Sequence, residues 1–168
     1  MEQLKTTEKL KPTEQRLNIF EKGQPAMKAL YGLAAYLAKS PVEHGLLNLV
    51  YYRVSQMNKC AFCLDMHSKD LLAAGESEQR LFVLDAWREA PFYSARERAA
   101  LAWAEALTKL SGGQVSDGIY KAAREQFSEE ELIDLTFAVI AINSYNRANI
   151  AFPGRVGTYQ PGAFSIKE

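Results

Sequence analysis

The sequence has few of the residues that build metal sites or disulfide frameworks: its 168 residues hold two cysteines and two histidines. Basic and acidic side chains number 20 each, so the formal net charge is zero. This balance gives no electrostatic footprint for nucleic acid or for an anionic membrane surface. The apolar run at residues 135–142 has only eight residues, too few to span a membrane. We therefore expect neither nucleic acid nor a membrane as a partner.

The N-terminal stretch MEQLKTTEKLKPTEQ is polar and lacks the apolar core of a signal peptide. We therefore expect a cytoplasmic protein. Thiols stay reduced in that compartment, so two cysteines three residues apart suit catalysis or metal binding better than a structural disulfide.

Apolar residues recur at helical spacing along most of the chain and predict an all-α fold. Pro25 opens the first such segment, and Pro41 is expected in the first turn of the next. Asn58 is the expected N-cap of a third helix, which Gly75 would end.

Two capping boxes mark helix starts in the second half of the chain, Ser94 with Glu97 and Ser128 with Glu131. No hairpin signal between alternating runs interrupts this pattern. The sequence thus predicts one domain.

The expected organisation has three parts. Residues 1–24 form an N-terminal segment, residues 25–152 a single helical domain, and residues 153–168 an irregular tail with two Pro-Gly pairs.

The motif that carries chemistry is Cys60, Cys63 and His67, which fall on one face of a helix at positions i, i+3 and i+7. Free N–H groups and the positive end of the helix dipole at its start stabilise a thiolate, and Lys59 adds a nearby positive charge. The imidazole of His67 titrates near neutral pH and can carry a proton. Two cysteines at this spacing can also form a disulfide, which fits a nucleophile and a resolving thiol.

Three other interpretations of this motif stay open at this point. Both cysteines could be small apolar core residues. A zinc site would need His44 as a fourth ligand, although His44 stands alone on another predicted helix. A thioredoxin-like site would need a strand before the motif, and the helical pattern lacks one.

Polar residues interrupt the last predicted helix, whose end is otherwise apolar. These are Asn143, Asn146, Arg147 and Asn149. They form either a solvated or interfacial helix face, which we favour, or a polar lining near the cysteines.

Three segments, at residues 46–76, 81–108 and 127–152, resemble the AhpD-like alkylhydroperoxidase branch of the carboxymuconolactone decarboxylase family. The resemblance spans about residues 25–152. Its most specific part is Ser-Gln followed by Cys-x-x-Cys-x-x-x-His, which begins at Ser55.

The resemblance implies an all-helical homo-oligomer, a trimer or hexamer, with peroxidase activity. Cys63 matches the cysteine that attacks the hydroperoxide, Cys60 the resolving cysteine and His67 the histidine of a proton relay. It implies no resident cofactor or metal, and it implies an external dithiol as reductant, supplied by a partner protein.

Two positions depart from the family pattern. The relay glutamate of the family lies twelve residues before the first cysteine, where this chain has Asn48. An amide can hold a water molecule, but it cannot take up a proton as a carboxylate does. Glu43 is a candidate substitute, and Tyr52, one turn after Asn48, is expected to face the same space. Lys59 stands where relatives commonly carry glycine.

These departures leave two alternatives to a peroxidase. One is an oligomeric, non-enzymatic or redox-sensing protein with an impaired proton relay. The other is the decarboxylase chemistry that names the wider family, although that reaction has no evident need for a cysteine pair.

Overall fold

A computed structural model describes residues 16–164, and in this range every regular element is a helix. The all-α prediction is confirmed for this part of the chain. The helices are α1 (Ile19–Lys22), α2 (Gln24–Leu37), α3 (His44–Asn58), α4 (Ala61–Ala73), α5 (Glu78–Phe82), α6 (Ala95–Lys109), α7 (Asp117–Gln126) and α8 (Glu129–Ala151). Short 3-10 turns lie at Leu84–Ala86 and Ser111–Gly113.

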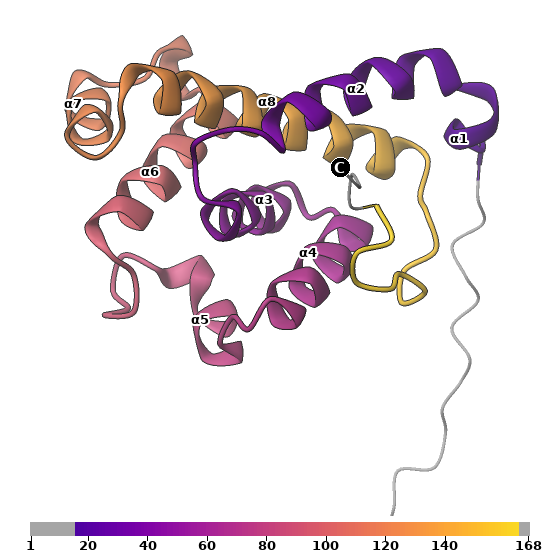
Figure 1. Cartoon of the computed structure of the whole chain (residues 1–168), viewed down its shortest axis with the longest axis horizontal. Helices are drawn as coiled ribbons and strands as arrows, with labels where there is room; N and C mark the ends of the chain where they lie inside the picture. Colours follow the sequence, from indigo (N-terminus) through magenta and orange to yellow (C-terminus); the bar gives the residue numbers. More distant parts are fainter. Residues whose placement is uncertain (1–15, 165–168) are drawn as a thin grey trace, which may run out of the picture.

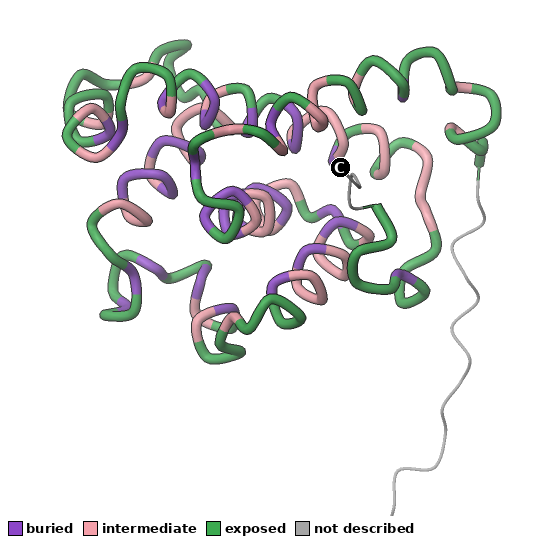
Figure 2. The backbone as a smooth tube through the Cα atoms, viewed as in Figure 1, coloured by how far each residue is buried: buried purple, intermediate pink, exposed green. Residues whose placement is uncertain are grey.

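Helix α3 is the centre of the fold. It packs against α4, α6 and α8, and Figure 1 shows it end-on with these helices around it and α2 alongside α8. Seven of its 15 residues are buried, as the colours along the tube in Figure 2 indicate, and Val50 and Val54 have no exposed surface. A helix enclosed on several sides must be apolar around much of its circumference.

Consecutive residues of α3 enter two different apolar clusters. Val50 packs in the larger one with residues such as Leu135 and Ile142 of α8. Leu49 packs in the smaller one with residues such as Trp87 and Leu101. Because neighbouring residues on a helix point about 100° apart, α3 joins the two clusters into one core.

Most helix ends follow the local signals in the sequence. Both capping boxes are present, at the starts of α6 and α8. Pro25 lies in the first turn of α2. Gly75 follows the end of α4 with a φ of +90°, a backbone conformation that favours glycine.

Two expectations about helix ends were wrong. Pro41 lies before α3, which begins at His44 with Glu43 as N-cap. Asn58 is not an N-cap; it is the last residue of α3, and Cys60 caps α4. Lys59 between them is left-handed, with a φ of 57°, which explains why glycine suits this position.

Within the expected N-terminal segment, residues 19–22 form the short helix α1. The first 15 residues of that segment, and the last four residues of the expected tail, lie outside the described part of the chain. Residues 153–164 form turns and irregular backbone.

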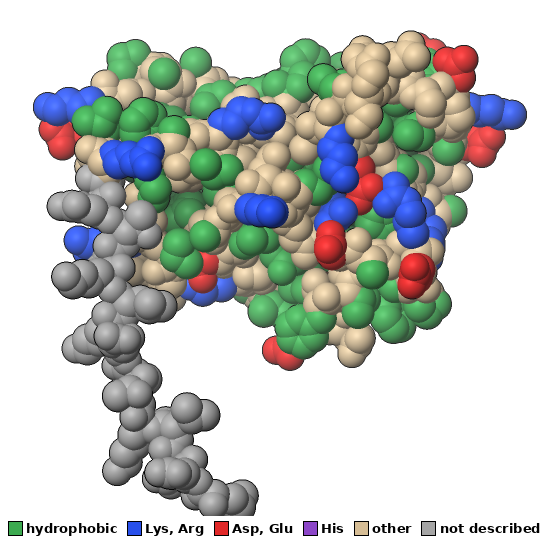
Figure 3. All heavy atoms as spheres, turned by 180° about the vertical axis from the view of Figure 1, so that it is seen from behind, with side chains coloured by type: hydrophobic (Ala, Val, Ile, Leu, Met, Phe, Trp, Pro, Cys, Tyr) green, Lys and Arg blue, Asp and Glu red, His purple; other side chains and the backbone are tan. Residues whose placement is uncertain are grey.

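Surface charge is mixed on the face seen in Figure 3, where basic side chains are scattered among acidic and apolar ones. None of the helices between residues 16 and 164 combines the length and the apolar character needed to cross a membrane.

A buried hydrogen-bond junction ties α8 to the end of α3. The amide of Asn146 is fully buried and donates to the Ser55 hydroxyl at 3.0 Å. The Asn58 amide donates to the side-chain oxygens of Asn146 and Asn143, each at 2.9 Å. Through this buried amide, Asn146 links Ser55 and Asn58 at the end of α3 to α8.

We predict that Asn146→Leu lowers the free energy of unfolding by about 1–3 kcal/mol, because it removes the two hydrogen bonds of a buried amide that join α8 to α3. Lys121→Leu is the control, since it places a leucine at an exposed position of α7, outside the junction. This control should change stability by less than about 0.5 kcal/mol. Equal losses in the two variants, measured by denaturant unfolding, would contradict a stabilising junction.

Candidate active site around the cysteine pair

The cysteine pair lies at the start of α4. The Cys60 sulfur caps the helix and accepts a hydrogen bond from the Cys63 backbone N–H at 3.4 Å. The two Cα atoms are 5.4 Å apart and the sulfurs are within disulfide distance. The pair can therefore alternate between two thiols and a disulfide without moving the backbone far.

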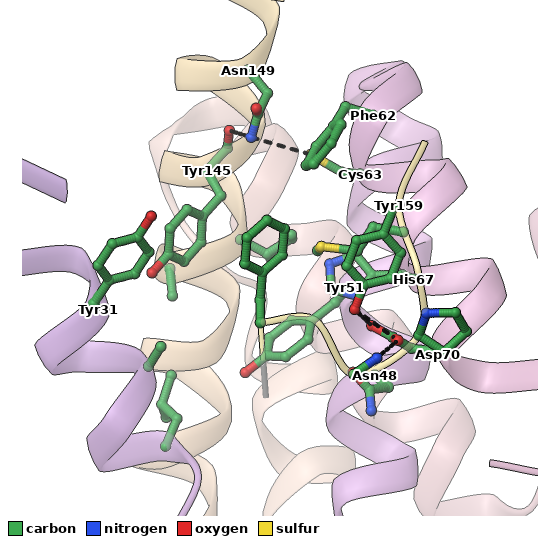
Figure 4. A pocket seen from close by; sticks show the side chains of 18 of the residues that line it. Tyr31, Asn48, Tyr51, Phe62, Cys63, His67, Asp70, Tyr145, Asn149 and Tyr159 are labelled. Carbon is green, nitrogen blue, oxygen red and sulfur yellow. Dashed lines mark hydrogen bonds between the residues drawn. The ribbon is translucent and has the colours of Figure 1, made fainter. Parts of the chain in front are cut away.

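A cavity of about 920 Å³ lies beside Cys63, between α2, α3, α4, α8 and the C-terminal segment (Figure 4). Cys63, His67 and Asn48 all line it. Most of the remaining wall is apolar, with aromatic rings contributed by Phe20, Tyr31, Tyr51, Phe62, Tyr145, Tyr159 and Phe164. This enclosure has room for an organic molecule, and the Cys63 side of the disulfide faces it.

His67 lies one helical turn after Cys63 and is 6% exposed. Burial lowers the pKa of its imidazole to about 4, so the ring is neutral at neutral pH. Neither ring nitrogen has a hydrogen-bond partner among the described residues. The Tyr51 ring lies against it, with ring centroids 5.4 Å apart. A neutral imidazole with both nitrogens free can accept a proton at one atom and donate one at the other.

Of the two candidate relay residues on α3, only Asn48 borders the cavity. Tyr52 was expected to face the same space, but it packs against the smaller apolar cluster. Its neighbour Tyr51 lines the cavity instead, and burial raises the pKa of that phenol. Tyr51 is therefore a neutral hydroxyl beside His67.

The polar residues of α8 prove to have different surroundings. Asn146 is in the buried junction and Arg147 is exposed, whereas Asn149 lines the cavity. Its amide nitrogen lies 3.8 Å from the Cys63 sulfur and donates to it. Asn149 thus supports a polar lining near the cysteines, which the sequence made the less favoured alternative to a solvated or interfacial helix face.

Tyr145, one turn before Asn149, was not among the sequence candidates. Its hydroxyl oxygen is buried without a hydrogen-bond partner among the described residues, and burial raises its pKa to about 12. Its ring stacks on Tyr31 across the cavity, with centroids 6.5 Å apart. In the sequence, only its position four residues before Asn149 on the same helix could have indicated that Tyr145 lines the cavity.

The irregular C-terminal segment closes one side of the cavity. The Tyr159 hydroxyl and the Gly162 N–H donate to the Asp70 carboxylate of α4, at 2.9 Å and 3.1 Å. Earlier in the same segment, the Gly157 N–H donates to the Asp65 carboxylate of α4 at 3.0 Å. Residues expected to form a simple tail thus contribute to the site.

Two other sequence candidates lie away from the pair. Glu43, considered as a substitute for the relay glutamate, forms an ion pair with Arg96 at 3.0 Å. His44 is exposed at the opposite end of α3 from the cysteines, so it is not placed to complete a zinc site with them. Between residues 16 and 164, no three His, Cys, Asp or Glu side chains gather as metal ligands would.

Comparison with known proteins identifies the family. A sequence model of the Carboxymuconolactone decarboxylase family matches residues 24–106. YdfG, an uncharacterised protein of Bacillus subtilis (strain 168), is 40% identical over 144 residues, which make up 86% of this chain and 98% of YdfG. The chain belongs to the carboxymuconolactone decarboxylase family.

Solved structures of similar fold refine this assignment. A protein of unknown function from Agrobacterium tumefaciens, considered a candidate antioxidant defence protein AhpD, has a TM-score of 0.82 and 36% identity, covering 87% of this chain and 100% of its own. The debrominase Bmp8 has a TM-score of 0.72 and 20% identity, covering 82% and 74% of the two chains. The protein is thus an AhpD-like member of the carboxymuconolactone decarboxylase family, a family that includes enzymes.

The buried His67 of this family member makes stability depend on pH. Its folded pKa of about 4 lies below the value of about 6.5 in an unfolded chain. As pH falls between these values, the unfolded chain takes up a proton that the folded protein does not. The free energy of unfolding therefore decreases, by on the order of 3 kcal/mol for this group.

We predict that His67→Gln removes this part of the pH dependence, because glutamine does not titrate. Denaturant unfolding of the disulfide form at about pH 7.5 and about pH 4.5 measures it. His44→Gln is the matched control and should lose as much stability on acidification as the original protein. An unchanged pH dependence in His67→Gln would contradict a buried neutral imidazole.

Proposed function

We propose that the protein is a thiol peroxidase that reduces organic hydroperoxides through a disulfide cycle of Cys60 and Cys63. The observation that carries the proposal is the cavity onto which Cys63 and His67 open together. Cys63 is the attacking thiol, because it lines this cavity. Cys60 is the resolving thiol, since it lies behind Cys63 at the cap of α4.

The first step oxidises Cys63. Its thiolate attacks the terminal oxygen of the hydroperoxide, the O–O bond breaks, and a sulfenic acid and an alkoxide form. The alkoxide takes the proton that the Cys63 thiol has lost, and the neutral His67 carries that proton between them. The free ring nitrogens of His67 suit this transfer.

The second step forms the disulfide. The Cys60 sulfur attacks the sulfur of the sulfenic acid and releases water, which retains the proton of the Cys60 thiol. The 5.4 Å separation of the Cα atoms favours this closure. An external dithiol, supplied by a partner protein, then reduces the disulfide; the cycle needs no metal or bound cofactor.

The lining of the cavity favours organic hydroperoxides over hydrogen peroxide. Burying a ring or an alkyl chain against the aromatic wall contributes binding energy that hydrogen peroxide cannot obtain. We further propose a cytoplasmic homo-oligomer, a trimer or hexamer. Exposed apolar residues of α8, Ile133, Phe137 and Ile140, recur on one face and suit contact with another copy.

Replacing each cysteine separately tests the assigned roles. We predict that Cys63→Ser abolishes the consumption of cumene hydroperoxide. Cys60→Ser should still consume one equivalent and stop, since it retains the attacking thiol but lacks the resolving one. A sulfenic acid probe with mass spectrometry should label Cys63 in this variant. Labelling of Cys60 in Cys63→Ser, with turnover retained, would contradict the roles.

One observation favours a second function, a redox sensor that is oxidised slowly and does not turn over efficiently. Asn48 lines the cavity at the position of the family's relay glutamate, and an amide cannot accept the proton. The same Cys60–Cys63 disulfide would then be a signal and not a catalytic intermediate.

Asn48→Glu separates the two functions. If the missing carboxylate limits the reaction, this variant should raise the rate of hydroperoxide reduction by about tenfold or more. Asn48→Gln is the matched control, because it has the same length without a charge, and it should stay near the original rate. High turnover in the original protein, with no gain in Asn48→Glu, would remove the sensor function.

A further inference from the structure

The amide of Asn149 is held in one orientation at the Cys63 end of the cavity. Its nitrogen donates to the backbone oxygen of Tyr145 at 3.0 Å and, with its other hydrogen, to the Cys63 sulfur at 3.8 Å. Figure 4 shows the side chain reaching from α8 toward Cys63. A flipped amide would place its oxygen against the Tyr145 carbonyl, where two acceptors repel each other. The nitrogen therefore faces the sulfur.

A thiolate at Cys63 has few other groups to stabilise it. None of the described residues that line the cavity is Lys or Arg. The one carboxylate of the lining, Asp70, is engaged by Tyr159 and Gly162. His67 is neutral and the tyrosine hydroxyls are neutral. Stabilisation of the thiolate must come from dipoles, namely the first turn of α4 and the amide of Asn149.

The oxygen of the same amide lacks a partner. The side-chain oxygen of Asn149 is buried and accepts no hydrogen bond from the described residues. A buried acceptor without a donor costs about 1–3 kcal/mol, so its presence beside a reactive sulfur indicates a donor that arrives with a ligand. The O–H of a hydroperoxide is such a donor.

We propose that Asn149 is a catalytic residue that holds the thiol and the peroxide together: its nitrogen stabilises the Cys63 thiolate, and its oxygen accepts a hydrogen bond from the terminal O–H of the hydroperoxide. The second half of this proposal rests on the proposed peroxidase function. The first half rests only on the contact with Cys63.

This arrangement fits the balance of the oxidation step. The hydrogen on the terminal oxygen stays on that oxygen, which becomes the OH of the sulfenic acid when the S–O bond forms and the O–O bond breaks. Asn149 therefore binds a group that persists through the reaction, while the thiol proton passes to the leaving alkoxide by way of His67. Holding both reactants at one amide supplies the orientation that the reaction needs.

The first arm of the test measures the thiolate without any peroxide. In the Cys60→Ser background, the rate of Cys63 alkylation by iodoacetamide is followed against pH. We expect Asn149→Asp to shift the profile upward by about one pH unit or more, because a carboxylate repels the thiolate. Asn149→Ala should shift it upward by less.

Ser144→Asp is the matched control, since it adds the same charge to α8 five residues earlier. It should leave the alkylation profile in place. Circular dichroism verifies folding, and Asn149→Ala alone decides the test if Asn149→Asp does not fold. Alkylation profiles of the Asn149 variants that coincide with that of the parent would overturn the first half of the proposal.

The second arm measures reduction of cumene hydroperoxide in the chain with both cysteines. We expect Asn149→Ala to lower kcat/KM by about tenfold or more, even at a pH where Cys63 is fully ionised. If the loss disappears at that pH, the amide acts only on the thiolate and the second half is wrong. A shifted alkylation profile in a protein that reduces no hydroperoxide would support the thiolate half and contradict the peroxidase function itself.

Discussion

The site depends on the buried amide of Asn146, because that amide fixes where α3 ends and α4 begins. By pairing with Ser55 and Asn58, it fastens the last turn of α3 to α8. The chain then reverses through a single left-handed residue, Lys59, and Cys60 follows directly as the cap of α4. Both cysteines therefore take their positions from a junction that contains no sulfur. The same helix α8 carries Asn149, three residues after Asn146, to the cavity.

Local signals in the sequence predicted the helices well, and tertiary contacts explain where they failed. Ser94 and Ser128 cap helices because a capping box is satisfied within four residues. Asn58 has the same preference for an N-cap, but its amide is engaged by Asn143 and Asn146 on α8. A partner some 85 residues away cannot be read from local propensity, and Cys60 takes the capping position instead.

The residues of the candidate site likewise fall into those that local spacing predicts and those that only tertiary packing places. The spacing of Cys63 and His67 placed them on one face of a helix, since that relation depends only on the helical repeat, whereas Cys60 proved to be the N-cap of that helix. Tyr51 and Tyr52 both lie within one turn of Asn48, so the repeat could not decide which of them borders the cavity. Packing decides it, because the smaller apolar cluster takes up Tyr52. Asn149 could be noticed as an interruption of an apolar helix, but its contact with Cys63 needed the packing of α8 against α4.

Access to the cavity distinguishes the two thiols, although they are equally buried. Cys60 and Cys63 are each only 1% exposed, so neither sulfur meets a partner at the protein surface. Cys63 nevertheless borders the cavity, and Cys60 is occupied as the cap of α4. The proposed hydroperoxide substrate would therefore reach Cys63 first. The same geometry limits how the proposed reductant can reach the disulfide. A flat protein surface cannot touch the buried sulfurs, but a dithiol that enters the cavity can attack the sulfur of Cys63. The thiolate released in that exchange is Cys60, which the N–H of Cys63 is already placed to stabilise.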